Sequence, residues 1–281
     1  MKMFITFGSG GQNYIDAGKR LIKQAKLTGY FDKIKLYTEK DLIIDEEFWN
    51  RHSKFISENK RGYGYWIWKS YIIKKTMENM KNGDILLYLD CGCEIGGSTQ
   101  KLIPKFFNHI KKDKIIGTET HNDKDWCKMD LLLHFDMQDS DLIHNPQHQA
   151  GAIMFYICEK TKFIVDLWYE TCCYYHMIDD SPSIKPNLNC FKEHRHDQAI
   201  FSLITKKYNI YSNESLSYCI HYLRNKTGIS KINKDDNKMR NTNTIMCNIS
   251  QITNVTTLVI VVVTLATVVI AATVVNKSRK H

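Results

Sequence analysis

The chain has 281 residues, of which 43% are hydrophobic and 11% aromatic, enough for a substantial core in one large domain or two small ones. Its formal net charge of +9 is dispersed along the sequence and forms no long run, which disfavours a nucleic-acid-binding protein. The nine cysteines form no CxxC pair. Their odd number in a chain this long argues against a disulfide framework and indicates reduced, mostly buried thiols.

The first segments alternate between strand and helix patterns. The apolar run from Met3 to Phe7 predicts a strand, and Gly8 opens a glycine-rich turn before a helical pattern that stops near Gly29. The alternation from Lys33 to Thr38 predicts a second strand with one solvated face. Because the turn lacks both the GxGxxG spacing and the Walker lysine, a simple tight turn and a ligand loop both stay open.

The stretch from Gly62 to Glu94 is the most distinctive. It begins with an aromatic and basic loop, GYGYWIWK, continues in a helical pattern, and ends with a buried strand that stops on Asp90. Ligands of open parallel sheets lie just outside the carboxyl ends of the strands. Asp90 is therefore the first candidate site residue, for a divalent cation or a ribose, although it can also simply cap the next turn. In the loop we expect Trp68 to be buried and Trp66 or Lys69 to lie nearer the site.

Strand and helix patterns keep alternating as far as Leu223. The predicted elements are a helix from Asp45 to Asn59, with His52 as a core histidine, a buried strand from Ile85 to Leu89, a strand from Ile115 to Thr118, a helix from Asp125 to Phe135, a strand from Ala152 to Ile157, a helix from Thr161 to Ile178, a loop from Ser181 to Asn189, a helix from Asp197 to Tyr208 and a strand from Tyr218 to Leu223. This order predicts an α/β fold with a mixed, mostly parallel sheet flanked by helices.

The C-terminal part differs sharply in composition. Residues 226–256 are rich in Asn, Lys, Thr and Ser and predict a polar linker after a globular domain spanning residues 1–225. Residues 257–275 are uncharged and almost wholly apolar, so they predict a single transmembrane helix, followed by a short basic tail at 276–281. The N-terminal apolar run is too short for a signal peptide, which favours a cytosolic position for the globular domain.

Four asparagines begin N-x-S/T triplets, namely Asn213, Asn225, Asn248 and Asn254. An asparagine-rich chain produces such triplets by chance, and lysine and arginine flank both sides of the apolar segment. The side of the membrane on which the domain lies therefore stays open at this stage.

The segment Gly62 to Lys69 and the strand end Asp90 to Cys93 resemble a group of bacterial and viral glycosyltransferases with the GT-A fold. Those proteins carry a GYGYW-x-WK segment followed by a D-x-G-C strand end. The order of motifs is also distantly similar to the retaining galactosyltransferases and glycogenin. Those have a DxD strand end, an asparagine-alanine-glycine turn, a DQ pair that opens a helix, and a late metal-binding histidine. Two departures stand out: Gly92 replaces the second aspartate, and Gln149 replaces the asparagine.

The resemblance implies roles for particular residues. The nucleotide-sugar donor would lie against Gly8, Trp66, Lys69, Asp90 and Gly92. The sugar or acceptor would lie against Gln149 and Gly151, and the residues nearest the reacting carbon would be Asp197 and Gln198. A divalent ion, Mn²⁺ or Mg²⁺, would be held by Asp90, Glu94 and His221. Either Glu94 stands in for the missing second aspartate, or the metal ion is absent.

The sequence thus predicts a membrane-anchored glycosyltransferase. It would move a sugar from a nucleotide-sugar donor, such as a uridine diphosphate sugar, to a glycan, protein or lipid acceptor. The alternative is a catalytically inactive glycosyltransferase-like membrane protein that binds a sugar or a partner. A nucleic-acid partner is not expected.

Overall fold

The computed structural model describes residues 1–212 and 214–232, and residues Met1–Lys231 form one compact unit. The predicted transmembrane helix at 257–275, the basic tail at 276–281 and the linker beyond residue 232 lie outside the described residues. No helix within the described ranges is long and apolar enough to cross a bilayer.

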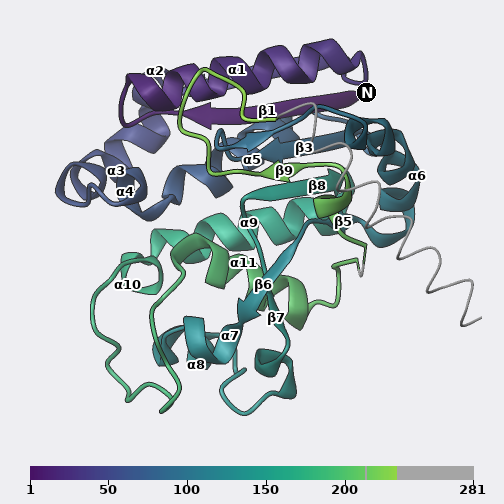
Figure 1. The fold of residues 1–281 in the computed structure, drawn as a ribbon. Helices are drawn as coiled ribbons and strands as arrows, with labels where there is room; N and C mark the ends of the chain where they lie inside the picture. Colours follow the sequence, from purple (N-terminus) through teal and green to yellow (C-terminus); the bar gives the residue numbers. More distant parts are fainter. Residues whose placement is uncertain (213, 233–281) are drawn as a thin grey trace, which may run out of the picture. The chain divides into compact units, whose positions relative to one another are not determined.

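A five-stranded sheet runs through the compact unit in the order β2-β1-β3-β8-β5 (Figure 1). Its strands are β1 (Lys2–Gly8), β2 (Lys33–Thr38), β3 (Ile85–Leu89), β5 (Ile115–Ile116) and β8 (Ala152–Tyr156). Strand β1 pairs in parallel with β2 and β3, whereas β8 runs antiparallel to both β3 and β5. Four of the five strands thus point the same way, and the predicted α/β class with a mixed, mostly parallel sheet is confirmed.

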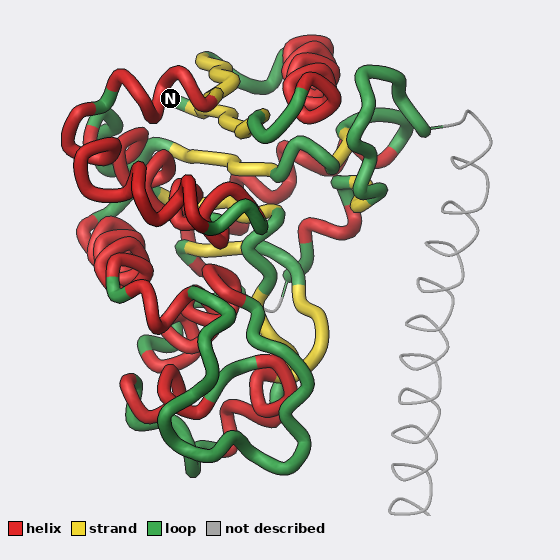
Figure 2. Tube along the Cα trace, turned by 90° about the vertical axis from the view of Figure 1, so that its left-hand side faces the viewer, coloured by secondary structure: helices red, strands yellow, loops and turns green. Residues whose placement is uncertain are grey.

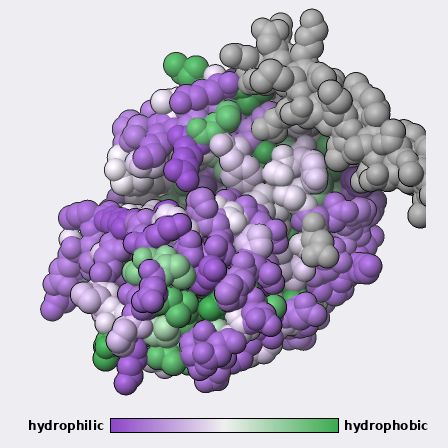
Figure 3. Space-filling view, turned by 60° about the horizontal axis from the view of Figure 1, so that its bottom comes forward, coloured by the Kyte–Doolittle hydropathy of each residue, from purple (hydrophilic) through white to green (hydrophobic). Residues whose placement is uncertain are grey.

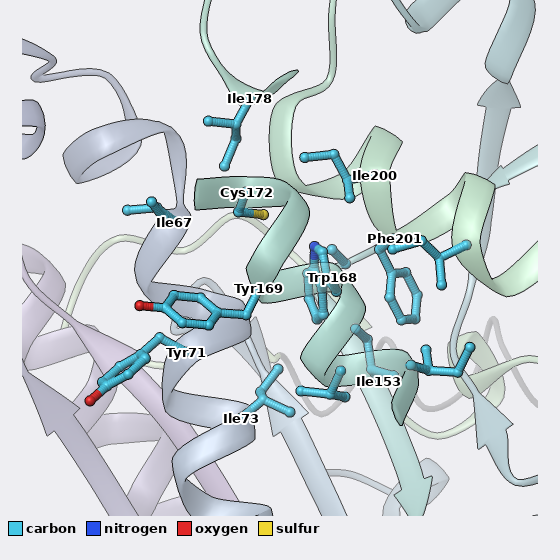
Figure 4. Close-up of a cluster of buried hydrophobic side chains, with 14 of the residues drawn as sticks. Ile67, Tyr71, Ile73, Ile153, Trp168, Tyr169, Cys172, Ile178, Ile200 and Phe201 are labelled. Atoms are coloured by element: carbon cyan, nitrogen blue, oxygen red, sulfur yellow. The ribbon is translucent and has the colours of Figure 1, made fainter. Parts of the chain in front are cut away.

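Helices cover both faces of this sheet (Figures 1 and 2). Leu87 and Leu89 of β3 pack in a cluster with α1 (Gln12–Thr28) and α6 (Ile103–Asp113). Leu86 and Tyr88 point to the other face and join a larger cluster built by α5 (Ile67–Glu78), α9 (Glu159–Cys173) and α11 (His196–Lys207), part of which Figure 4 shows. This alternation follows from the two-residue period of a strand.

The remaining elements complete the unit. They are α2 (Glu39–Ile44), α3 (Glu46–Glu58), α4 (Gly62–Tyr65), β4 (Cys93–Glu94), β6 (Glu119–Asn122), α7 (Asp123–Trp126), α8 (Met129–His134), β7 (Pro146–His148), α10 (Tyr175–Ile178), β9 (His221–Tyr222) and 3₁₀ turns at Thr99–Leu102, Asp141–His144 and Leu216–Tyr218. Strand β4 pairs with β9 and β6 with β7, both antiparallel. The part around α7 and α8 presents a largely hydrophilic face with an apolar area on it (Figure 3).

Two predicted helices are divided in the structure. The helix expected from Asp125 to Phe135 becomes α7 and α8, because Cys127 between them is extended with a φ of −130°. The helix expected from Thr161 to Ile178 becomes α9 and α10, which Tyr174 separates with a ψ of 85°.

His52 is a core histidine, as predicted. It is fully buried on α3, and its two ring nitrogens lie 2.9 Å from the hydroxyls of Tyr169 and Tyr175. Burial lowers the pKa of His52 to about 4, so the ring is neutral at physiological pH.

Candidate functional site

Three charged side chains from separate segments meet at the carboxyl end of β3. Asp90 follows the strand two residues after Tyr88, so both side chains point to the face that α5 and α11 cover. The Tyr88 hydroxyl donates to Asp90 Oδ1 at 2.5 Å. Lys69 Nζ, from the first turn of α5, lies 3.4 Å from Asp90 Oδ1 and 3.1 Å from Asp197 Oδ2 at the start of α11. The sequence-predicted residues Lys69, Asp90 and Asp197 are thus brought together.

The three members of this cluster differ in their access to solvent. The side chains of Lys69 and Asp197 are each 4% exposed, whereas that of Asp90 is 40% exposed. Burial disfavours the charged form of Lys69, but the carboxylates of Asp197 and Asp90 outweigh it and raise the pKa of the ammonium. Burial raises the pKa of Asp197 to about 6, although Lys69 opposes the shift. Asp90 is therefore the member that presents a carboxylate to a ligand.

Gly151 lies directly against Asp90. The Asp90 amide donates to the Gly151 carbonyl at 2.8 Å, and a Cβ at Gly151 would come within 3.1 Å of Asp90 Oδ2. A side chain here would crowd the carboxylate, so glycine keeps the site open. Gln149 lies two residues before Gly151, and its side chain accepts a hydrogen bond from the Thr118 hydroxyl at 2.9 Å.

The side chain of Gln198 is held by protein groups at both ends. Its Nε2 donates to Gln147 Oε1 at 2.6 Å, and its Oε1 accepts from the Ala150 amide at 3.4 Å. Gln147 in turn donates to the fully buried carboxylate of Asp123 at 2.8 Å. Through this series of hydrogen bonds, Gln198 positions the turn at Ala150 and Gly151, next to Asp90.

The loop before Lys69 is a turn in the left-handed region of backbone space. The φ angles are 56° at Tyr63, 51° at Tyr65 and 62° at Trp66, with Gly62 and Gly64 also positive. Each non-glycine residue in this conformation costs about 1–2 kcal/mol. The indole of Trp68 stabilises the turn by donating to the Gly62 carbonyl at 2.9 Å. Sequence patterns do not reveal such a turn, because only its two glycines favour it locally.

Trp68 is 6% exposed, as predicted, and its ring stacks on Phe7 at the end of β1 with centroids 3.9 Å apart. Gly8 follows Phe7 at the same edge of the sheet, where a Cβ would come within 2.8 Å of the Tyr14 carbonyl oxygen. Trp66 is partly buried, and its ring centroid lies 5.3 Å from that of His196. The turn therefore fixes the start of α5 against β1 and presents Lys69 to Asp90.

An ion-pair network ties this turn to the start of α11. The Arg61 guanidinium binds both Asp180, at 3.0 and 3.2 Å, and Glu193. Tyr65 stacks on the buried ring of His196, the residue before Asp197, with centroids 4.9 Å apart. These contacts hold the two segments that supply the ammonium and one carboxylate of the cluster.

A C-terminal strap, residues 224–231, crosses the loop that follows Asp90. A Cβ at Gly92 would come within 3.2 Å of Arg224 Cα, and the Gly92 carbonyl accepts from the Asn225 amide at 2.9 Å. The buried guanidinium of Arg20 donates to backbone carbonyls on both sides, those of Cys91 and Cys93 in the loop and those of Asn225 and Thr227 in the strap. Gly92 thus seats the strap, and a bulkier side chain there would displace it.

Glu94 anchors the same strap. It is fully buried, and its carboxylate accepts from Asn225 Nδ2 at 2.6 Å, the Lys231 amide at 2.9 Å, Gln24 Nε2 at 2.8 Å and the Ser230 hydroxyl at 2.5 Å. Burial on its own would raise the pKa of Glu94, but the hydrogen bonds from these groups lower it. Both oxygens are therefore occupied by donors of the chain.

The three residues predicted to hold a metal ion are not gathered into a metal site. His221 pairs with Glu94 in the β4–β9 ladder, but its Nε2 lies 3.0 Å from the Thr99 hydroxyl. Asp90 binds an ammonium and a phenol through Oδ1, and Glu94 binds four donors through both of its oxygens. No group of three or more potential ligand side chains forms within the described ranges. The donor groups present do not fit a divalent ion held by the chain alone.

A small pocket of about 150 Å³ lies at the opposite, amino end of the sheet, lined by Met3, Lys33, Tyr37, Thr76 and Met80 among others. It is remote from the cluster at Asp90, because β1, β2 and β3 all begin at this end of the sheet, whereas Asp90 follows the far end of β3. The chemistry is concentrated at the carboxyl end instead.

Comparison with known proteins yields distant structural similarities, of which two are described here. Mouse xyloside xylosyltransferase 1, in its apo form, is 11% identical, with 77% of this chain and 86% of that one covered and a TM-score of 0.41. Galactosyltransferase LgtC, in complex with donor and acceptor sugar analogs, is 13% identical, with 75% and 72% covered and a TM-score of 0.41. No protein-family model and no curated protein matches the sequence. Similarity at this level leaves the function to be argued from the site itself.

Proposed function

We propose that the chain is a glycosyltransferase that moves a sugar from a nucleotide-sugar donor to a glycan, protein or lipid acceptor. The observation that carries this proposal is the cluster of Asp90, Lys69 and Asp197 at the carboxyl end of the sheet. A half-exposed carboxylate at a strand end suits the hydroxyls of a ribose. The sequence resemblance at Gly62 to Lys69 and Asp90 to Cys93 points to the same class of donor.

The reaction breaks the bond between the anomeric carbon and the diphosphate oxygen, and the bonding electrons leave with the diphosphate. The acceptor oxygen then bonds to that carbon and releases its proton. Positive charge develops on the sugar ring in the transition state, and a fixed carboxylate next to it stabilises that charge. Asp90 presents its exposed carboxylate to the ring, and Asp197, held by Lys69 in a poorly solvated position, adds negative charge behind it.

Lys69 orients both carboxylates and keeps their mutual repulsion low. Gly151 leaves room beside Asp90 for the donor, and Gln198 holds the backbone of that turn in place. Arg224 and Lys226, on the strap over the same loop, supply positive charge that favours an anionic diphosphate.

The test is release of nucleoside diphosphate from a panel of nucleotide sugars by the purified full-length chain in detergent, compared with Asp90→Asn and Asp197→Asn. We expect one donor to be hydrolysed or transferred, and both substitutions to lower the rate by about 10²-fold or more, as losses of transition-state charge stabilisation do. If the chain neither binds nor turns over any of the donors, the proposal is refuted.

The seating of the strap on Gly92 favours a second candidate, a glycosyltransferase-like protein that binds a donor without transferring its sugar. A second aspartate cannot stand at this position without moving Arg224. Thermal-shift measurements separate the two candidates. A donor at 100 times its dissociation constant adds about 2.7 kcal/mol of stability in both cases. Turnover accompanies binding only in the enzyme.

We further propose that residues 257–275 anchor the chain in a membrane, with the catalytic domain on the cytosolic side. The support is the length and apolarity of this segment in the sequence. Retention of the full chain in the membrane pellet after alkaline carbonate extraction, and its release when the segment is deleted, is the expected result.

A further inference from the structure

The Asp90 site contains a positive charge that belongs to the chain itself. Lys69 Nζ lies within 3.4 Å of Asp90 and 3.1 Å of Asp197, and its side chain is 4% exposed. The ring of Tyr88 lies under the same ammonium, with its centroid 5.7 Å from Nζ. Two carboxylate oxygens that both contact one ammonium are spaced to share a cation, which is the usual role of a metal ion between acidic side chains.

The other groups that a metal ion would need are committed to the strap. Glu94 has both oxygens engaged by four donors, and Gly92 has Arg224 packed against its α-carbon. A second aspartate at residue 92 would press on the strap, because its Cβ would lie 3.2 Å from Arg224 Cα and the strap would have to shift by a few tenths of an ångström. A divalent ion on Asp90 would also be repelled by the ammonium bonded to the same carboxylate.

We propose that Lys69 takes the place of a divalent metal ion at the Asp90 site, so that the nucleotide-sugar donor binds there without one. The inference rests on the proposed function for the identity of the ligand, but the exclusion of the metal ion is a property of the chain alone. Lys69 compensates the charge of the two carboxylates at the point where the donor enters, and Arg224 and Lys226 of the strap add positive charge that favours its diphosphate.

Direct titration with Mn²⁺ tests the exclusion without any donor. Isothermal titration of the chelator-treated, full-length chain in detergent is expected to show no Mn²⁺ binding that depends on Asp90. The variants compared are Asp90→Asn and, as a matched control, Asp136→Asn, whose side chain is 88% exposed and whose φ of 53° suits asparagine. Mn²⁺ binding to the wild-type chain that Asp90→Asn abolishes and Asp136→Asn preserves would overturn the proposal.

The reciprocal variant is Lys69→Met, which removes the ammonium but keeps an unbranched chain of similar length. Once circular dichroism shows that it is folded, we expect it to gain a Mn²⁺ site that is lost again when Asp90→Asn is added. A folded Lys69→Met variant that still binds no Mn²⁺ would overturn the claim that the ammonium excludes the ion. The titration of the wild-type chain decides the question even where this variant fails to fold.

Donor binding supplies the second measurement. The dissociation constant of the best donor is expected to agree within about twofold with EDTA and with Mn²⁺, whereas a bridging metal ion would couple to the donor by about fivefold or more. Tightening of that size by Mn²⁺ would overturn the proposal. Failure of every donor to bind under both conditions refutes the proposed function, while the Mn²⁺ titration still decides whether Lys69 excludes the ion.

Discussion

Replacement of Glu94 by glutamine distinguishes its observed role in the strap from the role as metal ligand that the sequence resemblance implies. Four donors converge on the buried carboxylate, two on each oxygen. Glutamine keeps one acceptor oxygen but presents an amide group to the other two donors. Hydrogen bonds to charged groups contribute about 1.5–3 kcal/mol each, roughly twice as much as neutral ones. The two hydrogen bonds to the remaining oxygen become weaker, and the new amide group faces the other two donors. Together these changes should lower the free energy of unfolding by about 2–3 kcal/mol.

For a folded unit of this size, each kcal/mol shifts the melting temperature by about 2–4 °C, so Glu94→Gln should melt about 4–12 °C below the wild type. Differential scanning fluorimetry in EDTA measures this directly. The control is Glu58→Gln, whose side chain is 60% exposed and 3.9 Å from Lys54, and which should shift by less than about 1 kcal/mol. A Glu94→Gln variant that melts like the wild type in EDTA, yet loses a stabilisation by Mn²⁺ that the wild type shows, would refute the reasoning.

Three further predictions concern the turn, the core and the site. Gly62→Ala should destabilise the chain by at least about 2 kcal/mol more than Gly10→Ala. Both glycines have a positive φ, but only at Gly62 would the new Cβ lie 2.4 Å from the Trp66 ring. Equal melting temperatures of the two variants would contradict this. The free energy of unfolding should decline as pH falls from about 6.5 towards 4, because the pKa of His52 is lowered to about 4 in the folded chain and the unfolded chain takes up the proton first. His52→Gln should reduce the dependence of this free energy on pH, as measured by urea unfolding. Donor turnover should rise with pH around 6, where Asp197 ionises; a flat rate from pH 5 to 7 would show that the ionised carboxylate is not required.

The sequence predicts this fold well where the pattern is local. The strand that ends on Asp90, the opening strand, helix and second strand, and the buried histidine at position 52 follow from residue spacing and hydrophobicity, and the structure confirms them. The direction of β8 does not follow, because an apolar run reads the same whichever way its strand points. Pairing with β3 decides it, and that pairing joins segments about seventy residues apart, from Leu89 with Ala152 to Ile85 with Tyr156.

The site itself was predictable as a set of candidates but not as an arrangement. Lys69, Asp90 and Asp197 are visible in the sequence, yet nothing local shows that one ammonium joins both carboxylates. Glu94 is the clearest limit. Its position after a D-x-G strand end suggests a metal ligand, but a strap more than a hundred residues later occupies its oxygens. The role of such a buried carboxylate depends on which donors from distant parts of the chain contact it in the folded structure.

The hydrogen bond from Asn225 to Glu94 also has a consequence for the compartment in which the chain can fold. Asn225 begins an N-x-T triplet, is fully buried, and donates through Nδ2 to both Glu94 and the Ile229 carbonyl. An oligosaccharide on that nitrogen would leave it one N–H for two acceptors, and it could not be accommodated at a fully buried side chain. The folded unit therefore requires Asn225 to escape glycosylation, as it would on the cytosolic side of a membrane. A single buried amide thus makes folding sensitive to whether residue 225 meets the N-glycosylation machinery before it is buried.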